Sequence, residues 1–214
     1  MGQRTTTGDP SPDLQARVRA AVLPLARALA ARGVTANSLT IAGVILNAGV
    51  AAAIAAGWFP TSGFLLLAAN ALDLLDGAVA RASGRATPFG AFLDSTLDRY
   101  AEIVVFVGLV GWFASESNWH GELLTTLALA GSLMVSYTRA RAEGLGLHGE
   151  VGLLPRPARV VLLAAGLILA AVPGLAWTLE ASVAALAVLT NLTALQRGHH
   201  VWRQTRGSAS GPRS

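Results

Sequence analysis

Long apolar runs separated by short polar connections dominate the chain. Such runs are typical of membrane helices, because an α-helix needs roughly 18–20 apolar residues to span a bilayer. The pattern predicts six spans, of which the fifth is short: Leu39–Trp58, Ser62–Ala80, Phe89–Phe113, Leu123–Arg141, Ala158–Val172 and Ala176–Gln196. The expected fold class is therefore all-α, a polytopic membrane protein.

An amphipathic pattern precedes the first run. Apolar residues fall on one helical face at Leu14, Val18, Ala21, Leu25 and Leu29, whereas Arg17, Arg19, Arg27 and Arg32 lie away from it. This arrangement is typical of a helix that lies in the membrane interface. We therefore divide the chain into a disordered N-terminus (1–12), a juxtamembrane amphipathic helix (13–33), a six-helix domain (34–205) and a disordered tail (206–214).

Arginine placement indicates the orientation of the spans. The connections near 57–62, 114–122 and 173–177 contain no arginine, whereas the N-terminal segment, the other connections and the C-terminus do. The positive-inside rule then puts both termini in the cytosol, and Trp58, Trp112, Trp119 and Trp177 gather at the opposite ends as an interfacial belt would. We expect a multi-pass protein of the cell membrane.

Composition supports a membrane protein over a soluble domain. Hydrophobic residues make up 53% of the 214 residues and charged residues only 13%, against roughly a quarter charged in soluble domains. The net charge of +4 is explained by topology and anionic lipid headgroups, so no nucleic-acid partner is expected. The absence of cysteine excludes disulfides and thiolate metal sites.

Acidic residues concentrate in one stretch, DLLDGAVARASGRATPFGAFLDSTLD, which runs from Asp73 to Asp98 and holds four of the six aspartates. At about 1.5 Å per residue, all four fall at similar depth in the cytosolic half of the second and third spans. The spacing of Asp73 and Asp76, and that of Asp94 and Asp98, puts each pair on one helical face. The sequence therefore predicts four carboxylates facing one cavity, with small residues at Gly77, Ala80 and Gly90 that admit a bulky ligand.

Four close carboxylates in a pocket of low dielectric constant need compensation. They can share protons, as in an ion-coupled carrier, or hold hard divalent cations, which take oxygen ligands. Two Mg²⁺ ions would neutralise all four charges. Pairing with arginine for packing alone is disfavoured, because Arg81, Arg85 and Arg99 are expected to be the only nearby cations.

These positions resemble a known motif. Asp73-x2-Asp76-Gly77-x2-Ala80-Arg81-x8-Gly90-x3-Asp94-x3-Asp98 is similar to the signature of the CDP-alcohol phosphotransferases. The resemblance implies a six-helix membrane enzyme that moves a phosphatidyl group from CDP-diacylglycerol to an alcohol and releases CMP. It also implies a homodimer.

The resemblance assigns residue roles as well. It makes Asp73, Asp76, Asp94 and Asp98 ligands of two divalent cations, Mg²⁺ or Mn²⁺, and Asp98 also the general base. Contacts with the donor are implied for Asn37, Ser38, Leu39, Thr40, Gly77, Arg81 and Thr87.

The acceptor is indicated by arginines near the cytosolic ends of the last three spans: Arg139, Arg141, Arg159 and Arg197. Arginine suits phosphate because its planar fork binds bidentately. The segments SYTRARAE, RPAR and QR resemble those of bacterial phosphatidylinositol-phosphate synthases, in which they build the pocket for the phosphate of inositol phosphate. We therefore predict a phosphorylated polyol as acceptor, most simply inositol phosphate. Glycerol phosphate, or an uncharged alcohol such as inositol or serine, remains open.

Two other functions remain open at this stage. An intramembrane prenyltransferase also uses aspartate-bound Mg²⁺, but its acidic motifs normally lie farther apart than Asp76 and Asp94. An ion-coupled carrier would normally show an inverted repeat and broken spans. Two further acids are noted: Glu102, which could orient Asp98 or fill a polar interior, and Glu143, which is spaced to pair with Arg139.

Overall fold

The computed structural model describes residues 12–84, 87–149, 151–152 and 154–208, with side chains within residues 21–206. The described residues form seven α-helices: α1 (Pro12–Ala31), α2 (Ala36–Ala55), α3 (Phe59–Ala82), α4 (Pro88–Ser115), α5 (Trp119–Glu143), α6 (Arg156–Ala170) and α7 (Trp177–Ser208). The all-α prediction is confirmed, and α2 to α7 coincide with the six predicted apolar runs.

One predicted boundary needs correction. α7 continues through Ser208, past residue 205, where we placed the end of the domain. The apolar pattern ends near Gln196, but the polar residues after it keep the helical backbone, because a helix does not have to stop where its apolar stretch stops. The rest of the two segments predicted to be disordered, 1–11 and 209–214, lies outside the described residues.

Three helical segments in the described part of the chain are long and apolar enough to cross a membrane: Ala36–Ala55, Phe59–Ala82 and Trp177–Arg206. The α6 helix, with 15 residues, is too short for that criterion. In α4, Asp94, Asp98, Arg99 and Glu102 interrupt the apolar sequence. The structure therefore supports a multi-pass membrane protein, and the number of six spans stays a prediction.

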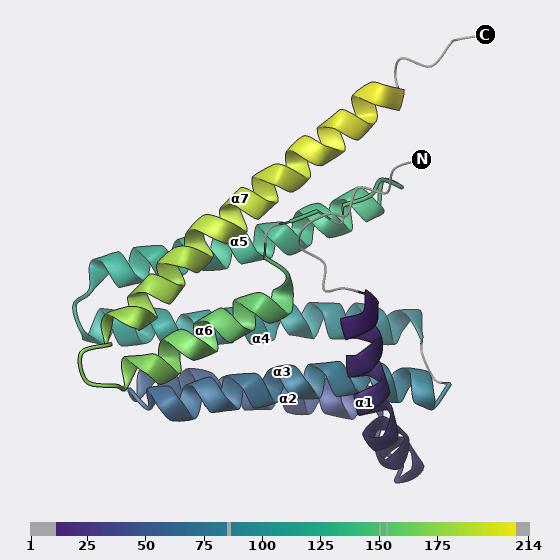
Figure 1. The fold of residues 1–214 in the computed structure, drawn as a ribbon, viewed down its shortest axis with the longest axis horizontal. Helices are drawn as coiled ribbons and strands as arrows, with labels where there is room; N and C mark the ends of the chain where they lie inside the picture. Colours follow the sequence, from purple (N-terminus) through teal and green to yellow (C-terminus); the bar gives the residue numbers. More distant parts are fainter. Residues whose placement is uncertain (1–11, 85–86, 150, 153, 209–214) are drawn as a thin grey trace.

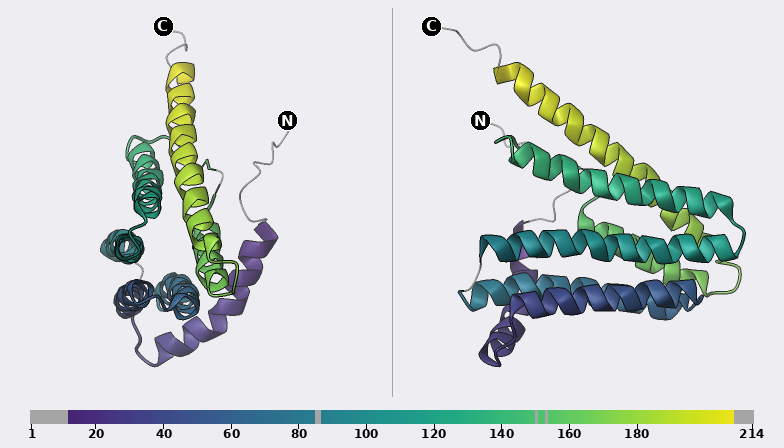
Figure 2. Two further views of the ribbon diagram at one scale, coloured as in Figure 1. Left: turned by 90° about the vertical axis from the view of Figure 1, so that its left-hand side faces the viewer. Right: turned by 180° about the vertical axis from the view of Figure 1, so that it is seen from behind.

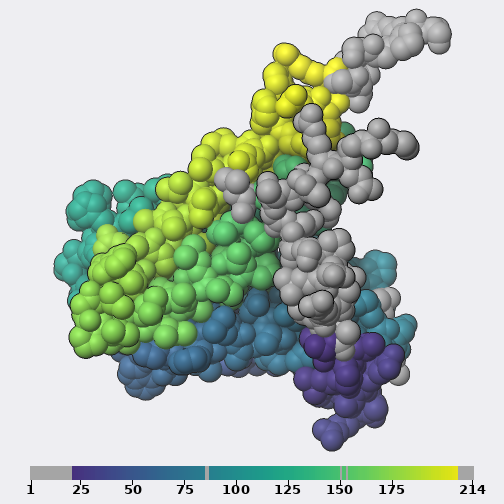
Figure 3. All heavy atoms as spheres, viewed as in Figure 1, coloured from purple at the N-terminus to yellow at the C-terminus, as the bar shows by residue number. Residues whose placement is uncertain are grey.

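Helices α2 to α7 form a closed ring. Each contacts two neighbours, in the order α2, α3, α6, α7, α5, α4 and back to α2. Figure 1 shows these helices side by side with α7 inclined to the others, and the left panel of Figure 2 looks nearly along α2, α3 and α4. In the space-filling view, the C-terminal part of α7 projects beyond the body of the molecule (Figure 3).

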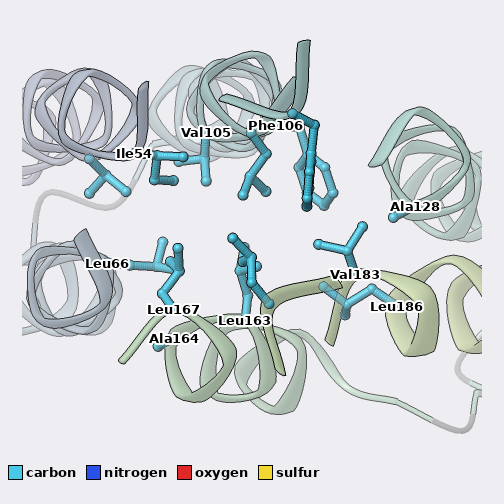
Figure 4. Close-up of a cluster of buried hydrophobic side chains, with 14 of the residues drawn as sticks. Ile54, Leu66, Val105, Phe106, Ala128, Leu163, Ala164, Leu167, Val183 and Leu186 are labelled. Carbon is cyan, nitrogen blue, oxygen red and sulfur yellow. The ribbon is translucent and has the colours of Figure 1, made fainter. Parts of the chain in front are cut away.

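The hydrophobic core fills one end of this ring. All six helices contribute side chains that point toward one another, including Ile54, Leu66, Phe106, Ala128, Leu167 and Val183 (Figure 4). Val50 and Ile54 lie near the C-terminal end of α2, so this core lies at the end of the ring away from the start of α2. The start of α2 therefore marks the end that is left for polar groups.

The α1 helix crosses the outside of the ring and contacts α3 (Figure 1). Its buried residue Ala26 packs against Ala78 and Val79 of α3. Leu25, on the predicted apolar face, is 52% exposed, and the contact of that face with the membrane interface stays a prediction. Periodicity alone did not distinguish the apolar side that meets protein from the apolar side that would meet lipid.

We predict that Gly108→Ala will destabilise the ring where α2 and α4 meet. A Cβ atom at Gly108 would lie 2.6 Å from the carbonyl oxygen of Ala51 and 2.8 Å from its Cα atom. Because both are backbone atoms, the helices must separate, at a cost of about 1–3 kcal/mol. Thermal unfolding in detergent should show a lower Tm.

The matched control is Gly111→Ala on the same helix, where no described atom lies within 4 Å of the added Cβ. Alanine favours the helix over glycine, so this variant should keep or slightly raise the Tm. An unchanged Tm in Gly108→Ala would contradict the close approach of α2 and α4.

Candidate active site

A cavity lies inside the ring and borders the core. Its polar lining comes from all six helices: Thr40, Asn47, Asn70, Asp73, Asp76, Asp98, Glu102, Ser132, Arg156, Arg159 and Thr190. Its apolar floor includes Leu66, Val105, Phe106 and Leu163, which also belong to the core. The closed ring therefore brings residues from distant parts of the chain around one space.

Three of the four predicted aspartates form a compact cluster. Each of Asp73, Asp76 and Asp94 offers a carboxylate oxygen, and these oxygens all lie within 4.8 Å of one another. The i, i+3 spacing on α3 turns Asp73 and Asp76 to the same side, and Asp94 reaches them from α4. The predicted grouping of acids from these two helices is thus seen for these three residues.

The two acidic helices meet through side chains. In the described part of the chain, no Cα atom of α3 lies within 8 Å of one of α4, and α2 contacts both helices. From α2, the hydroxyl of Thr40 donates to Oδ2 of Asp76 over 2.9 Å. Thr40 therefore holds the carboxylate of Asp76. The carboxylates of Asp73 and Asp94 lie between α3 and α4 without this contact.

The cluster fits a hard divalent cation. Its donors are carboxylate oxygens, the ligands that Mg²⁺ and Mn²⁺ take. Oδ1 of Asp94 is buried and, among the described residues, has no hydrogen-bond partner. A buried carboxylate oxygen without a donor is costly, so a bound cation would satisfy the atom that the protein leaves unpaired.

Asp98 lies beside this cluster and is held by an arginine. The Nη1 atom of Arg156 donates to Asp98 and, over 2.9 Å, to Oδ2 of Asp73. Arg156 thus joins the acids of α3 and α4 from the start of α6. It corrects our expectation that Arg81, Arg85 and Arg99 are the only cations near the acids; of these, Arg85 lies outside the described residues.

Sequence reasoning did not assign Arg156 to the site. The signal that would have found it is the segment RPAR at the start of α6, where Arg156 and Arg159 stand three residues apart and so on one helical face. Only the second of these arginines is among the predicted site residues.

Two of the residues predicted to bind the donor line the cavity, and two others precede them at the start of α2. Thr35 and Ser38 form a capping box at the start of α2, which places Asn37 and Ser38 in an exposed first turn. Leu39 and Thr40 line the cavity itself. This local structure therefore leads from solvent directly to the aspartates.

Two glycines, Gly77 and Gly90, lie close to predicted donor-binding residues. A Cβ atom at Gly77 would lie 3.3 Å from the guanidinium of Arg81, and one at Gly90 would lie 3.1 Å from Oγ1 of Thr87 and 3.8 Å from Oδ1 of Asn37. Thr87 caps α4 by accepting from the amide of Gly90 over 3.0 Å. The predicted donor-binding residues of α2, α3 and α4 therefore lie on the same side of the molecule as the acids.

The four predicted acceptor arginines occupy different environments. Arg159 lines the cavity with 8% of its surface exposed, and its Nε atom has no partner among the described residues. Arg139 is exposed and pairs with Glu143 over 2.8 Å, as predicted, and Arg141 is exposed. Arg197 donates to the carbonyl oxygens of Val151, over 2.6 Å, and Val135. Arg159 is therefore the one among these four that lines the cavity.

Glu102 is also part of the lining, and its contacts decide between its two predicted roles. It accepts from the hydroxyl of Ser132, pairs with Arg99 and lies 3.6 Å from Nη1 of Arg159. Asp98, by contrast, is held by Arg156. Glu102 therefore belongs to a polar interior around Arg159.

Comparison with known proteins agrees with this site. The family model of CDP-alcohol phosphatidyltransferase matches residues 33–193. The archaetidylinositol phosphate synthase of Methanothermobacter thermautotrophicus is 39% identical over 80% of this chain and 85% of its own. The phosphatidylinositol phosphate synthase of Mycobacteroides abscessus is 40% identical over 83% of this chain and 82% of its own.

Solved structures give the same result. The phosphatidylinositol phosphate synthase of Mycobacterium tuberculosis with CDP-DAG bound matches with a TM-score of 0.78 and 33% identity, over 85% of this chain and 93% of that one. A second structure of that enzyme, in complex with manganese and citrate, also has a TM-score of 0.78. With the family model, the relatives and the shared fold in agreement, the chain belongs to the CDP-alcohol phosphatidyltransferase family of membrane enzymes.

Proposed function

We propose that this enzyme transfers a phosphatidyl group from CDP-diacylglycerol to a hydroxyl of inositol phosphate, forming phosphatidylinositol phosphate and CMP. The observation that carries the acceptor assignment is Arg159. Its buried guanidinium lines the same cavity as Asp98 and leaves Nε without a partner among the described residues. A phosphate group suits such a site, because charge-assisted hydrogen bonds to arginine are strong. The two similar enzymes, an archaetidylinositol phosphate synthase and a phosphatidylinositol phosphate synthase, support the same acceptor.

We assign two divalent cations, Mg²⁺ or Mn²⁺, to the four aspartates. Asp73, Asp76 and Asp94 form the compact group, and Asp98 adds a fourth carboxylate. A bound cation would polarise the diphosphate and stabilise the charge that develops on CMP. The manganese complex of the Mycobacterium tuberculosis enzyme supports the choice of metal.

Asp98 acts as the general base in this scheme. The acceptor oxygen forms a bond to the phosphorus that carries the lipid, and the bond from that phosphorus to the bridging oxygen breaks, so that CMP leaves. The proton of the acceptor hydroxyl passes to Asp98. Arg156 holds the Asp98 carboxylate by a hydrogen bond and ion pair, which fixes the position of the base before the acceptor arrives.

Substrate contacts are assigned around this centre. The residues that would contact the donor are Asn37, Ser38, Leu39, Thr40, Gly77, Arg81 and Thr87. The lining position of Leu39 and Thr40 supports this assignment. For the acceptor phosphate we propose Arg159 as the central contact. Arg139, Arg141 and Arg197 would contribute at its periphery.

The membrane arrangement follows from the donor. A lipid donor can keep its tails in the bilayer while its headgroup enters the ring. We propose six spans within residues 34–205, with both termini and the active site on the cytosolic side, as the distribution of arginine favours. We also propose that the enzyme works as a homodimer.

The main proposal is tested by supplying purified enzyme with CDP-diacylglycerol, Mn²⁺ and one acceptor at a time, and measuring CMP release. Inositol phosphate should support the fastest release, and unphosphorylated inositol should support little, because it has no group for Arg159. Faster CMP release with glycerol phosphate would show that glycerol phosphate, not inositol phosphate, is the preferred acceptor. No CMP with any of these alcohols would refute the transfer of a phosphatidyl group to a polyol.

We predict that Asp94→Asn will weaken Mn²⁺ binding about tenfold or more. The variant removes the charge of a carboxylate ligand, and even residues that only support a ligand can cost 10–100-fold in affinity. Electron paramagnetic resonance of free Mn²⁺ measures this without turnover. Glu143→Gln, which changes an exposed acid paired with Arg139, should bind Mn²⁺ as wild type does. Equal Mn²⁺ affinity in both variants would show that Asp94 is not a metal ligand.

We predict that Asp98→Asn will lower kcat by roughly 10²-fold or more, since an amide cannot accept the proton and general-base catalysis contributes about 10²–10⁴-fold. Binding of CDP-diacylglycerol should stay within a few-fold of wild type. The control is Glu116→Gln, an acid-to-amide change at an exposed residue after α4, which should retain full activity. Substantial turnover in Asp98→Asn would show that another group takes the proton.

A further inference from the structure

A chain of polar side chains connects α6 to α5 and α4 beside the cavity. Nη1 of Arg159 donates to the hydroxyl oxygen of Ser132, and that hydroxyl donates to Oε1 of Glu102. Oε2 of Glu102 pairs with Arg99. Ser132 is only 1% exposed and Arg159 only 8%, so their contact lies inside the protein, whereas the side chains of Glu102 and Arg99 are partly exposed, at 17% and 24%.

The chemistry of these groups fixes the direction of the chain. A guanidinium can only donate, and an ionised carboxylate can only accept. Ser132 therefore accepts from Arg159 and gives its single proton to Glu102. The hydroxyl of Ser132 therefore holds the guanidinium in one position, because Arg159 cannot accept a hydrogen bond and Glu102 cannot donate one.

The charges also require this partner. A buried guanidinium is costly unless it is paired, and Glu102 lies 3.6 Å from Nη1 of Arg159. The pairing uses the Nη1 side of the guanidinium and leaves Nε without a partner among the described residues. One edge of the arginine is thus anchored, and another is kept for a ligand.

The two arginines of RPAR, Arg156 and Arg159, bond to different partners. Arg156 bonds to Asp73 and Asp98, whereas Arg159 bonds to Ser132 and lies beside Glu102. Because the hydrogen bonds and ion pairs of the two arginines share no residue, the base and the anion contact have separate bonding partners on one helix. A change at Ser132 should therefore affect Arg159 without displacing Asp98.

We propose that Ser132 and Glu102 are positioning residues that hold Arg159 for the phosphate group of the acceptor. This inference rests on the proposed function, because it requires a phosphorylated acceptor. Neither residue needs to touch the substrate. Their effect is to keep the guanidinium oriented before binding, which lowers the entropy that binding would otherwise cost.

The test is a double-mutant cycle of Ser132→Ala and Arg159→Ala, with KM for inositol phosphate, KM for CDP-diacylglycerol and kcat measured for each enzyme. Ser132→Ala should raise the acceptor KM roughly tenfold, as expected for a lost hydrogen bond to a charged group, and change the donor KM less than twofold. Arg159→Ala should raise the acceptor KM more. Adding Ser132→Ala to Arg159→Ala should have no further effect, since the arginine it positions is gone.

The outcomes separate the two proposals. If Arg159→Ala leaves the acceptor KM unchanged, the phosphate pocket of the proposed function is wrong. Suppose that Arg159→Ala raises the acceptor KM as expected. If Ser132→Ala then raises the acceptor KM as much in the double variant as alone, or raises the donor and acceptor KM values equally, Ser132 has a general structural role. Either result overturns the positioning inference. Glu102→Ala should give the same selective rise in acceptor KM, and Ser132→Ala keeps the test valid if that variant does not fold.

The matched control is Ser62→Ala. Ser62 is fully buried like Ser132, but its hydroxyl donates to the carbonyl of Trp58 one turn earlier in the chain, over 2.7 Å. Removing this hydroxyl should leave both KM values unchanged. A rise of the acceptor KM in Ser62→Ala as large as that in Ser132→Ala would also count against the inference.

Discussion

The structure depends on a concentration of like charge inside an apolar ring of helices. Asp73, Asp76 and Asp94 place oxygens within 4.8 Å of one another, in surroundings where unpaired charge is expensive. The chain supplies only part of the compensation: Thr40 donates to Asp76, and Arg156 pairs with Asp73 and Asp98. Oδ1 of Asp94, which has no hydrogen-bond partner among the described residues, lies where a divalent cation would complete the site.

This constraint explains why the ring is closed. Within the described residues, α3 and α4, which carry the acids, do not pack directly against each other, so their spacing must be set by other elements. Helix α2 contacts both of them, and α6 reaches their acids through Arg156. Tight approaches such as Gly108 against Ala51 keep the ring narrow enough for side chains of six helices to meet in one cavity.

The sequence was sufficient to predict the helices and the acids. Apolar runs of spanning length identify α2 to α5 and α7 directly, and helical spacing identifies the aspartate faces. It was insufficient for Arg156 and Glu102. The acids that bond to Arg156 lie 58 and 83 residues away in the sequence. Ser132, which bonds to Glu102, lies 30 residues away. Periodicity describes one helix at a time, so it cannot show which helices become neighbours in the ring.

The same limit explains the arginines of the second half. The four arginines at the predicted cytosolic ends of the predicted spans have the same appearance in sequence, because topology alone would place them there. The structure separates them by burial: Arg139 and Arg141 are exposed, Arg197 bonds to backbone carbonyls, and Arg159 lies in the cavity. Burial is informative because a buried guanidinium needs a partner. In the part of the chain that the structure describes, Nε of Arg159 has no partner, although Ser132 and Glu102 are close to the same guanidinium. An interior that holds an arginine so firmly and still leaves one donor open is suited to an anionic ligand.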